Sequence, residues 1–345
     1  MTTVSVVIPT YNGARYIGRA LDSVLAQSYH DYEIIVVDDG STDHTREVLQ
    51  PYDGRIKYIY QDNQTLPVAR NTGVAAASGE YVAFLDCDDM FLPAKLEIQT
   101  RYLISHGNVG LVASGFQYID QDDSVIGEHV PAVTDSSISI ESLLFGGLAP
   151  VHAVLLRRCW LDAVGGFDAG YAFCEDVNLW YRLALAGCPM MREQTIVCQY
   201  RLHSSNMTRS PAKHFRYSRR ALKEALDDPR MPSELRSKES QLMAQRYLAE
   251  ATRHLRGQWL DQAHRCVDRA LELDPELLSR NGLGLAELAV GLQSDVWGDG
   301  GFAELLIHKL MDVLPRFRNT VETVAAKKRF YDAAINHDAT TVRTE

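Results

Sequence analysis

The first third of the chain alternates between two hydrophobic periodicities. Residues 4–8, VSVVI, form a β-branched run without a polar face, which predicts a central parallel strand covered by helices on both sides. In residues 13–27 apolar side chains recur at the spacing of a helix, for which Asn12 is a candidate cap. EIIVVDD at residues 33–39 then predicts a second buried strand, so the chain begins with a strand, a helix and a strand.

This alternation continues to about residue 106. We expect a short helix after Ser41, an extended segment at residues 56–60, a helix at 66–78, a strand at 80–86 and a helix that begins near Pro93. The order predicts an α/β fold, with an open, mostly parallel sheet and flanking helices. In such sheets ligands bind beyond the carboxyl ends of the strands.

Polar residues collect at those predicted strand ends. They are Pro9, Thr10, Tyr11 and Asn12 after the first strand, Asp38 and Asp39 after the second, and Asp86, Cys87, Asp88 and Asp89 after YVAFL. Three elements therefore open onto one predicted acidic cleft.

The acidic triplet has two interpretations. Asp86 and Asp88 are two residues apart, so on an extended backbone their side chains share a face and repel unless a cation lies between them. Magnesium and manganese prefer carboxylate oxygen, and a diphosphate can complete such a site. Alternatively, Asp88 and Asp89 cap the helix near Pro93. The segment at Asp39 also has two interpretations. Ser41 or Thr42 could simply cap the next helix, or Asp39 could accept a hydrogen bond from a base or ribose.

Long amphipathic helical patterns replace the strands from about residue 212. We predict a catalytic domain at residues 1–211, with a nucleotide and metal half at about 1–110 and an acceptor half at about 111–211. An all-α region follows at 212–335, and a tail at 336–345 has little to bury. Ser233 is a candidate cap for a helix that runs to residue 257, and residues 247–275 resemble a single tetratricopeptide-type hairpin.

Composition narrows the class of protein. The 345 residues are 46% hydrophobic, which allows a proper core, and a formal charge of −10 argues against nonspecific binding to nucleic acid. Six cysteines are scattered without a CxxC pair, and no signal peptide or transmembrane pattern is found, so we expect a cytoplasmic protein. The basic residues 316–331 could dock it at the inner face of a membrane or on another protein, although a solvated helix explains them equally well.

Four sequence blocks, read in order, resemble the family 2 glycosyltransferases of the GT-A fold. They are SVVIPTYN, IIVVDDGSTD, PVARNTGVAAASGEYVAFLDCDD and GGFDAGYAFCEDVNLWYRLALAG, which together cover about residues 3–210. The resemblance implies that Pro9, Thr10, Tyr11 and Asn12 surround the nucleotide base and that Asp39 accepts a hydrogen bond from it. It also implies that Arg70 lies near the nucleotide, that Asp86 faces the ribose and that Asp88 binds the metal, whereas Cys87 has no redox role. Asp89 could support these residues from behind or only cap a helix.

The same resemblance implies roles in the second half. Asp176 is the expected catalytic base, with Glu175 supporting it or binding the acceptor, although both residues would also favour the positive end of a helix. Arg201 is expected near the donor and His203 near the metal, but His203 could equally be a surface histidine. His152 could face the acceptor cleft, but we expect a structural role for it, because a lone histidine before an apolar strand is more often structural.

These implications predict a metal-dependent, inverting glycosyltransferase. With Mn²⁺ or Mg²⁺, it would move a sugar from a nucleotide-diphosphate donor to a hydroxyl of a glycan, lipid-linked or protein acceptor, in cell-surface or envelope polysaccharide synthesis. A nucleotidyltransferase is one alternative, but PTYNGARYIG is not a convincing glycine-rich, basic triphosphate loop. A noncatalytic interaction module is the other, and Asp88 and Asp176 argue against it.

Overall fold

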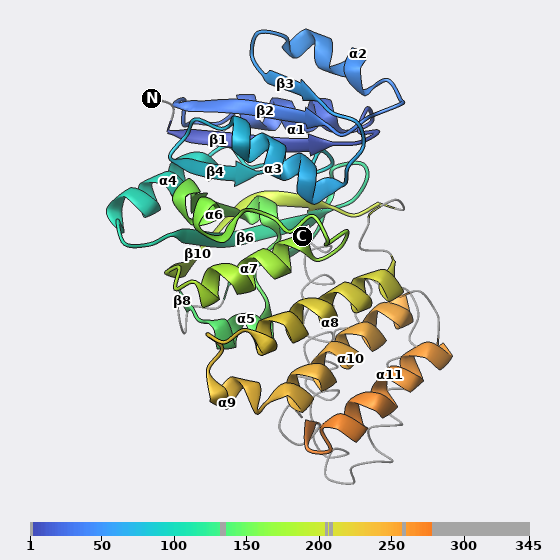
Figure 1. Ribbon diagram of the computed structural model, residues 1–345. Coiled ribbons are helices and arrows are strands. Elements are labelled where there is room, and N and C mark those ends of the chain that lie inside the picture. The colour runs from blue at the N-terminus through green and yellow to red at the C-terminus, as the bar shows by residue number, and fades with distance from the viewer. Residues whose placement is uncertain (1–2, 132–135, 204–205, 207–209, 257–259, 278–345) are drawn as a thin grey trace, which may run out of the picture. The chain divides into compact units, whose positions relative to one another are not determined.

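The computed structural model describes residues 3–131, 136–203, 206, 210–256 and 260–277 (Figure 1). The chain divides into two compact units, Met1–Glu239 and Ser240–Glu345.

The first half of the larger unit follows the predicted alternation of strands and helices. Its elements are β1 (Val4–Thr10), α1 (Ile17–Leu25), β2 (Tyr32–Asp38), α2 (Thr45–Leu49), η1 (Gln50–Tyr52), β3 (Lys57–Tyr60), α3 (Leu66–Ala76), β4 (Tyr81–Phe84), β5 (Met90–Phe91) and α4 (Lys95–Ser105). Every strand and helix predicted in this region is therefore present.

The second half of this unit adds strands to the same sheet and ends in helices. Its elements are β6 (Leu111–Ile119), β7 (Val125–His129), β8 (Ser137–Ile138), α5 (Ile140–Gly146), η2 (Val151–Ala153), β9 (Val154–Arg157), α6 (Arg158–Val164), α7 (Glu175–Leu185), β10 (Met190–Arg201), α8 (Pro211–Asp227) and α9 (Ser233–Arg236). Helix α8 packs against α7. The predicted domain boundary at residue 211 stays a prediction.

The strands of the described residues form one mixed sheet in the order β3-β2-β1-β4-β9-β6-β10-β5. As predicted, β1 is a central strand, parallel to both β2 and β4. Thr10 is in register with Asp38, and Val7 with Phe84, so these three strands end at one edge of the sheet. The parallel character continues in β6 and β10, whereas β9 runs antiparallel between β4 and β6.

Helices cover both faces of the parallel strands. Val6 of β1 and Val36 of β2 belong to one core cluster with side chains of α1 and α4, such as Leu21. The alternate β2 residues, including Val37, pack against α3 through Ala69. Figure 1 shows α3 lying across the near face of these strands. This double burial explains why the strand sequences have no polar face.

The structure excludes the helix-cap interpretations of the polar loop residues. Helix α1 begins after Tyr16, and Asn12 instead has a left-handed backbone with φ 53°. Helix α2 begins after His44, not after Ser41 or Thr42. Helix α4 begins after Ala94, too far along the chain for Asp88 or Asp89 to cap it. The cap predictions were therefore wrong, and these side chains are available for other contacts.

The helix predicted from Ser233 to residue 257 is also wrong in part. Ser233 is the first residue of α9 and not its cap, and a second helix, α10 (Glu239–Arg256), begins after a break. In the second unit α10 and α11 (Leu260–Leu273) share a small apolar cluster that includes Ala244 and Ala270. The resemblance to a tetratricopeptide hairpin stays a prediction, and residues 278–345 lie outside the described residues.

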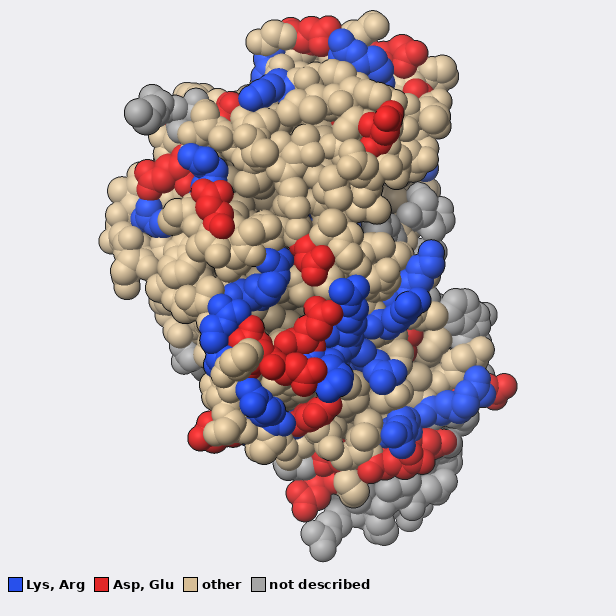
Figure 2. Space-filling model, viewed as in Figure 1, with Lys and Arg blue, Asp and Glu red and all other residues tan. Residues whose placement is uncertain are grey.

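Lys and Arg side chains gather over helix α8, although the whole chain is acidic (Figure 2). The exposed basic side chains of this helix are Lys213, Arg216, Arg219, Arg220 and Lys223. Two of them are paired along the helix, Arg220 with Glu224 at 2.8 Å and Lys223 with Asp227 at 3.4 Å. The basic segment 316–331, for which docking on a membrane or a protein and a solvated helix were both open, lies outside the described residues. Within the described residues no helix is both long and apolar enough to span a bilayer.

Candidate functional site

The loops that follow β1 and β2 are bonded to each other. The Asn12 side-chain oxygen accepts hydrogen bonds from the backbone N–H groups of Thr42, at 2.8 Å, and Asp43, at 3.3 Å. In return, the backbone N–H of Asn12 donates to the Ser41 hydroxyl at 2.8 Å. Tyr11 beside them is 53% exposed, whereas Pro9 and Thr10 are buried at the end of β1. Of the four predicted base-binding residues, only Tyr11 and Asn12 are therefore exposed at the end of the sheet.

Asp39 is buried at the end of β2 and holds the segment that precedes α3. One carboxylate oxygen accepts from the Gln61 side chain at 2.7 Å and from the Gln64 N–H at 2.9 Å, and the other accepts from the Thr65 N–H at 3.0 Å. A carboxylate has about four acceptor positions, so these three bonds leave about one for a ligand. The role of Asp39 toward a base stays a prediction.

Arg70 of α3 joins Asp86, which follows β4, to Glu175, the first residue of α7. The guanidinium is 1% exposed and donates to Glu175 at 2.5 Å and to Asp86 at 2.6 Å. Burial disfavours its charged form, but the Asp86 and Glu175 carboxylates outweigh this effect and raise the pKa of Arg70 above its ordinary value. Sequence reasoning named both Arg70 and Glu175 but did not predict their contact, because 105 residues separate the two and no local pattern joins them.

Asp88 and His203 come together although 115 residues separate them. The His203 Nε2 atom lies 2.9 Å from the Asp88 Oδ2 atom, and both side chains keep some exposure, 9% and 25% respectively. The His203 ring also stacks on Tyr16, with ring centroids 5.2 Å apart. Carboxylate oxygen and imidazole nitrogen suit Mn²⁺, and Mg²⁺ accepts the carboxylate, so this pair fits a divalent cation.

Arg201 lies beneath this pair, completely buried. Its Nε donates to the backbone oxygen of Asp88 at 2.8 Å, and Nη1 donates to that of Asp120 at 2.9 Å and pairs with Asp123 at 2.5 Å. The guanidinium also lies over the Tyr16 ring, 4.8 Å from its centroid. These contacts of Arg201 are all with the protein, and its expected contact with the donor stays a prediction.

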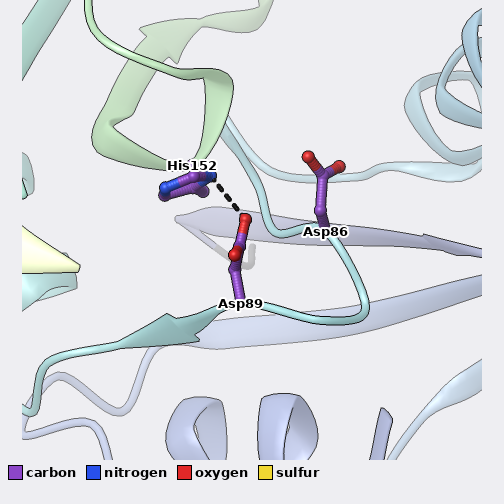
Figure 3. Close-up of side chains that lie close together, drawn as sticks. All are labelled: Asp86, Asp89 and His152. Atoms are coloured by element: carbon purple, nitrogen blue, oxygen red, sulfur yellow. Dashed lines mark ion pairs between the residues drawn. The ribbon is translucent and has the colours of Figure 1, made fainter. Parts of the chain in front are cut away.

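A second group of possible metal ligands includes residues of the acidic loop, which is the segment 86–89 between β4 and β5. Asp86, Asp89 and His152 offer ligand atoms within 4.8 Å of one another. Figure 3 shows the Asp89 carboxylate directed at the His152 ring, 2.9 Å away, and the Asp86 carboxylate directed elsewhere. Asp89 and His152 are each 1% exposed, and burial raises the pKa of Asp89 to about 7. The predicted structural role of His152 agrees with this burial.

Glu175 and Asp176 open helix α7. The preceding residue, Cys174, has a left-handed backbone with φ 56°, which turns the chain sharply into the helix. Burial, together with the neighbouring Glu175 carboxylate, raises the pKa of Asp176 to about 7, although Arg70 opposes the shift. A carboxylate with this pKa is suited to accept a proton near neutral pH. Cys87, by contrast, is a thiol whose pKa burial raises, which favours the unreactive protonated form.

Comparison with known proteins identifies the family. The family model described as Glycosyl transferase family 2 matches residues 5–140. The putative teichuronic acid biosynthesis glycosyltransferase TuaG of Bacillus subtilis is 37% identical over 210 residues, which are 59% of this chain and 81% of TuaG. The chain belongs to glycosyltransferase family 2.

Other relatives differ in the share of their length that is matched. The Escherichia coli UDP-Glc:alpha-D-GlcNAc-diphosphoundecaprenol beta-1,3-glucosyltransferase WfgD is 29% identical over 229 residues, 66% of this chain and 87% of WfgD. An uncharacterized glycosyltransferase of Rickettsia felis is 32% identical over 220 residues, 61% of this chain. The match covers only 36% of that protein, and the same share of a Rickettsia conorii relative.

Solved structures show that the fold is GT-A. S. aureus TarS 1–349 in complex with UDP-GlcNAc matches with a TM-score of 0.60 at 17% identity, over 95% of this chain and 91% of that one. The Pyrobaculum calidifontis mannosyltransferase PcManGT, in complex with GDP-Man and Mn²⁺, matches with a TM-score of 0.56 at 19% identity, over 91% and 87%. The predicted fold class is confirmed.

Proposed function

We propose that the protein is a metal-dependent, inverting glycosyltransferase that moves a sugar from a nucleotide-diphosphate donor to a hydroxyl acceptor. The observation that carries this proposal is the buried Arg70 bridge. It joins Asp86, on the strand-end side where a nucleotide would bind, to Glu175, next to the only proposed base, Asp176. One guanidinium thus couples the donor side of the site to the acceptor side.

The proposed chemistry is a single displacement. Asp176 takes the proton of the acceptor hydroxyl as that oxygen attacks the anomeric carbon, and the bond from this carbon to the diphosphate breaks. Asp88 and His203 would hold a Mn²⁺ or Mg²⁺ ion, which would supply positive charge to stabilise the departing diphosphate. Arg70 keeps Glu175 and Asp86 paired, so that the negative charges around Asp176 are balanced.

The proposed substrates follow the relatives. The names of WfgD and TarS point to a UDP-sugar donor, whereas PcManGT binds GDP-Man. The names of TuaG and WfgD favour a polysaccharide or a lipid-diphosphate-linked sugar as acceptor, in synthesis of a cell-surface or envelope glycan. A protein acceptor stays an alternative. Docking at the inner face of a membrane is likewise part of the proposal.

Hydrolysis of a panel of UDP- and GDP-sugars, with and without Mn²⁺, tests the proposal. We expect release of the nucleoside diphosphate from one donor, dependent on the cation and lost in Asp88→Ala. The matched control is Asp122→Ala, which removes an exposed carboxylate from the turn after β6 and should leave turnover unchanged. Pyrophosphate release from a nucleoside triphosphate would support the nucleotidyltransferase alternative. No turnover with any donor, even with added acceptor extract, would support a noncatalytic module.

A further inference from the structure

Strand β10 and the acidic loop are connected beyond their regular pairing. The short antiparallel ladder of β5 and β10 pairs Phe91 with Cys198 and Met90 with Gln199. Asp89, the residue before this ladder, extends it with its side chain, because its Oδ1 accepts the backbone N–H of Arg201 at 2.8 Å. The carboxylate thus takes the place of a further backbone pair.

The Arg201 side chain also contacts the main chain next to Asp89. Its Nε donates to the backbone oxygen of Asp88 at 2.8 Å. Each strand therefore uses one buried side chain to hold the main chain of the other, and these two bonds form a reciprocal tether between Asp89 and Arg201. Asp88 lies one residue before Asp89, and His203 lies two residues after Arg201. The tether consequently fixes the relative positions of the two main-chain segments that carry Asp88 and His203. From these segments the two side chains approach to 2.9 Å.

Two further contacts fix the tether from its sides. His152 lies 2.9 Å from the second Asp89 oxygen and is itself 1% exposed. Tyr16, the residue before α1, contacts the last residue of β10 and the segment after it, with Arg201 over its ring at 4.8 Å and the His203 ring stacked at 5.2 Å. The Oδ1 atom of Asp89 therefore accepts the Arg201 N–H, while the Oδ2 atom faces the His152 ring and has no hydrogen-bond partner among the described residues.

We propose that Asp89 is a positioning residue, which through its bond to Arg201 holds Asp88 and His203 at the separation needed to bind a divalent cation. The proposal rests on the cation site of the proposed function and assigns the one acidic residue of the triplet that this function leaves without a role. Groups that orient metal ligands typically contribute 10- to 100-fold to metal affinity.

Binding of Mn²⁺ to the full chain in the presence of UDP tests the proposal without a turnover assay. Electron paramagnetic resonance of free Mn²⁺ gives the dissociation constant. We expect Asp89→Ala to weaken binding about 10- to 100-fold. Asp89→Asn keeps an oxygen for the Arg201 N–H and should recover most of that loss. The matched control is Asp123→Asn, which alters a carboxylate that contacts the same guanidinium but not the acidic loop, and it should bind Mn²⁺ as the unaltered protein does.

Near-ultraviolet circular dichroism shows which variants are folded. If Asp89→Ala does not fold, Asp89→Asn still tests the proposal. A folded Asp89→Ala that binds Mn²⁺ like the unaltered protein would overturn the tether and leave the proposed function intact. If Asp89→Asn loses Mn²⁺ as fully as Asp88→Ala does, Asp89 is a ligand and the proposal is wrong. If the unaltered protein binds no Mn²⁺, the cation site of the proposed function fails, and this inference fails with it.

Discussion

Replacing Glu175 by Gln should move the acid limb of the pH–rate profile to lower pH. The pKa of Asp176 is raised to about 7, first by burial and second by the Glu175 carboxylate, while Arg70 lowers it. Gln keeps an oxygen that can accept from Arg70 but removes the negative charge. Arg70 then has one carboxylate partner fewer, so its positive charge acts more strongly on Asp176. Both changes favour the ionised form of Asp176 and lower its pKa.

The expected change in kcat/KM follows from the change in the pKa of Asp176. A base with a pKa of about 7 is about 10% ionised at pH 6 and about 1% ionised at pH 5, so kcat/KM of the unaltered enzyme should fall about tenfold per unit below pH 6. Loss of a neighbouring like charge, such as that of Glu175, lowers the pKa of a carboxyl group by roughly one unit. At pH 5 the ionised fraction in Glu175→Gln should therefore be about ten times larger than in the unaltered enzyme.

The assay is kcat/KM for sugar transfer between pH 5 and 9 at constant ionic strength and saturating Mn²⁺, compared as profile shapes because the absolute rate of the variant can also change. Glu80→Gln is the control, since it removes an exposed carboxylate that pairs with Arg157 at the opposite end of β4. An acid limb that stays in place or moves upward in Glu175→Gln would refute the reasoning. So would an unaltered enzyme whose activity is flat down to pH 5, because Asp176 would then have an ordinary pKa.

Three further predictions concern stability, measured by urea unfolding. Arg70→Ala leaves Asp86 and Glu175 without their cation and should cost about 3–5 kcal/mol, and a loss below about 1 kcal/mol would contradict the buried bridge. Gly73→Ala places a Cβ 2.3 Å from a Val7 methyl and should lower the free energy of unfolding by about 1–3 kcal/mol. The double variant with Val7→Ala should recover part of this loss, whereas a double variant whose loss equals the sum of the two single losses would contradict the contact. Burial lowers the pKa of Lys95 to about 7, so above this pH the unfolded chain binds more protons than the folded one. The free energy of unfolding should consequently rise by up to about 1.4 kcal/mol per pH unit between pH 7 and 10, and Lys95→Met, unlike the surface variant Lys213→Met, should remove this slope.

The fold could be predicted because its signals are local. The buried run at Val4–Ile8, the helical spacing that follows and the next strand are each visible in a few residues, and the parallel order follows from their alternation. The helix caps were predicted poorly for a physical reason. Asn12 has the chemistry of a cap, but a left-handed backbone and bonds to Thr42 and Asp43 draw its side chain into the neighbouring loop instead.

The sequence predicted which residues form the candidate site better than it predicted the contacts between them. The resemblance to family 2 named Asp88 and His203, and the structure brings them to 2.9 Å. It also named Arg70 and Glu175, but not their contact, which depends on how two segments 105 residues apart pack. Asp89 and Arg201 show the same limit, since their tether joins two strand ends that no sequence spacing relates.

The anomeric configuration of the transferred sugar tests the central claim most directly. Proton NMR during the reaction of an α-linked UDP-sugar with its acceptor reports the linkage as it forms. The proposed single displacement predicts a β-linked product and one UDP per bond formed, dependent on Mn²⁺ and reduced about 10²- to 10⁴-fold in Asp176→Asn. An α-linked product, or undiminished transfer in Asp176→Asn, would contradict it.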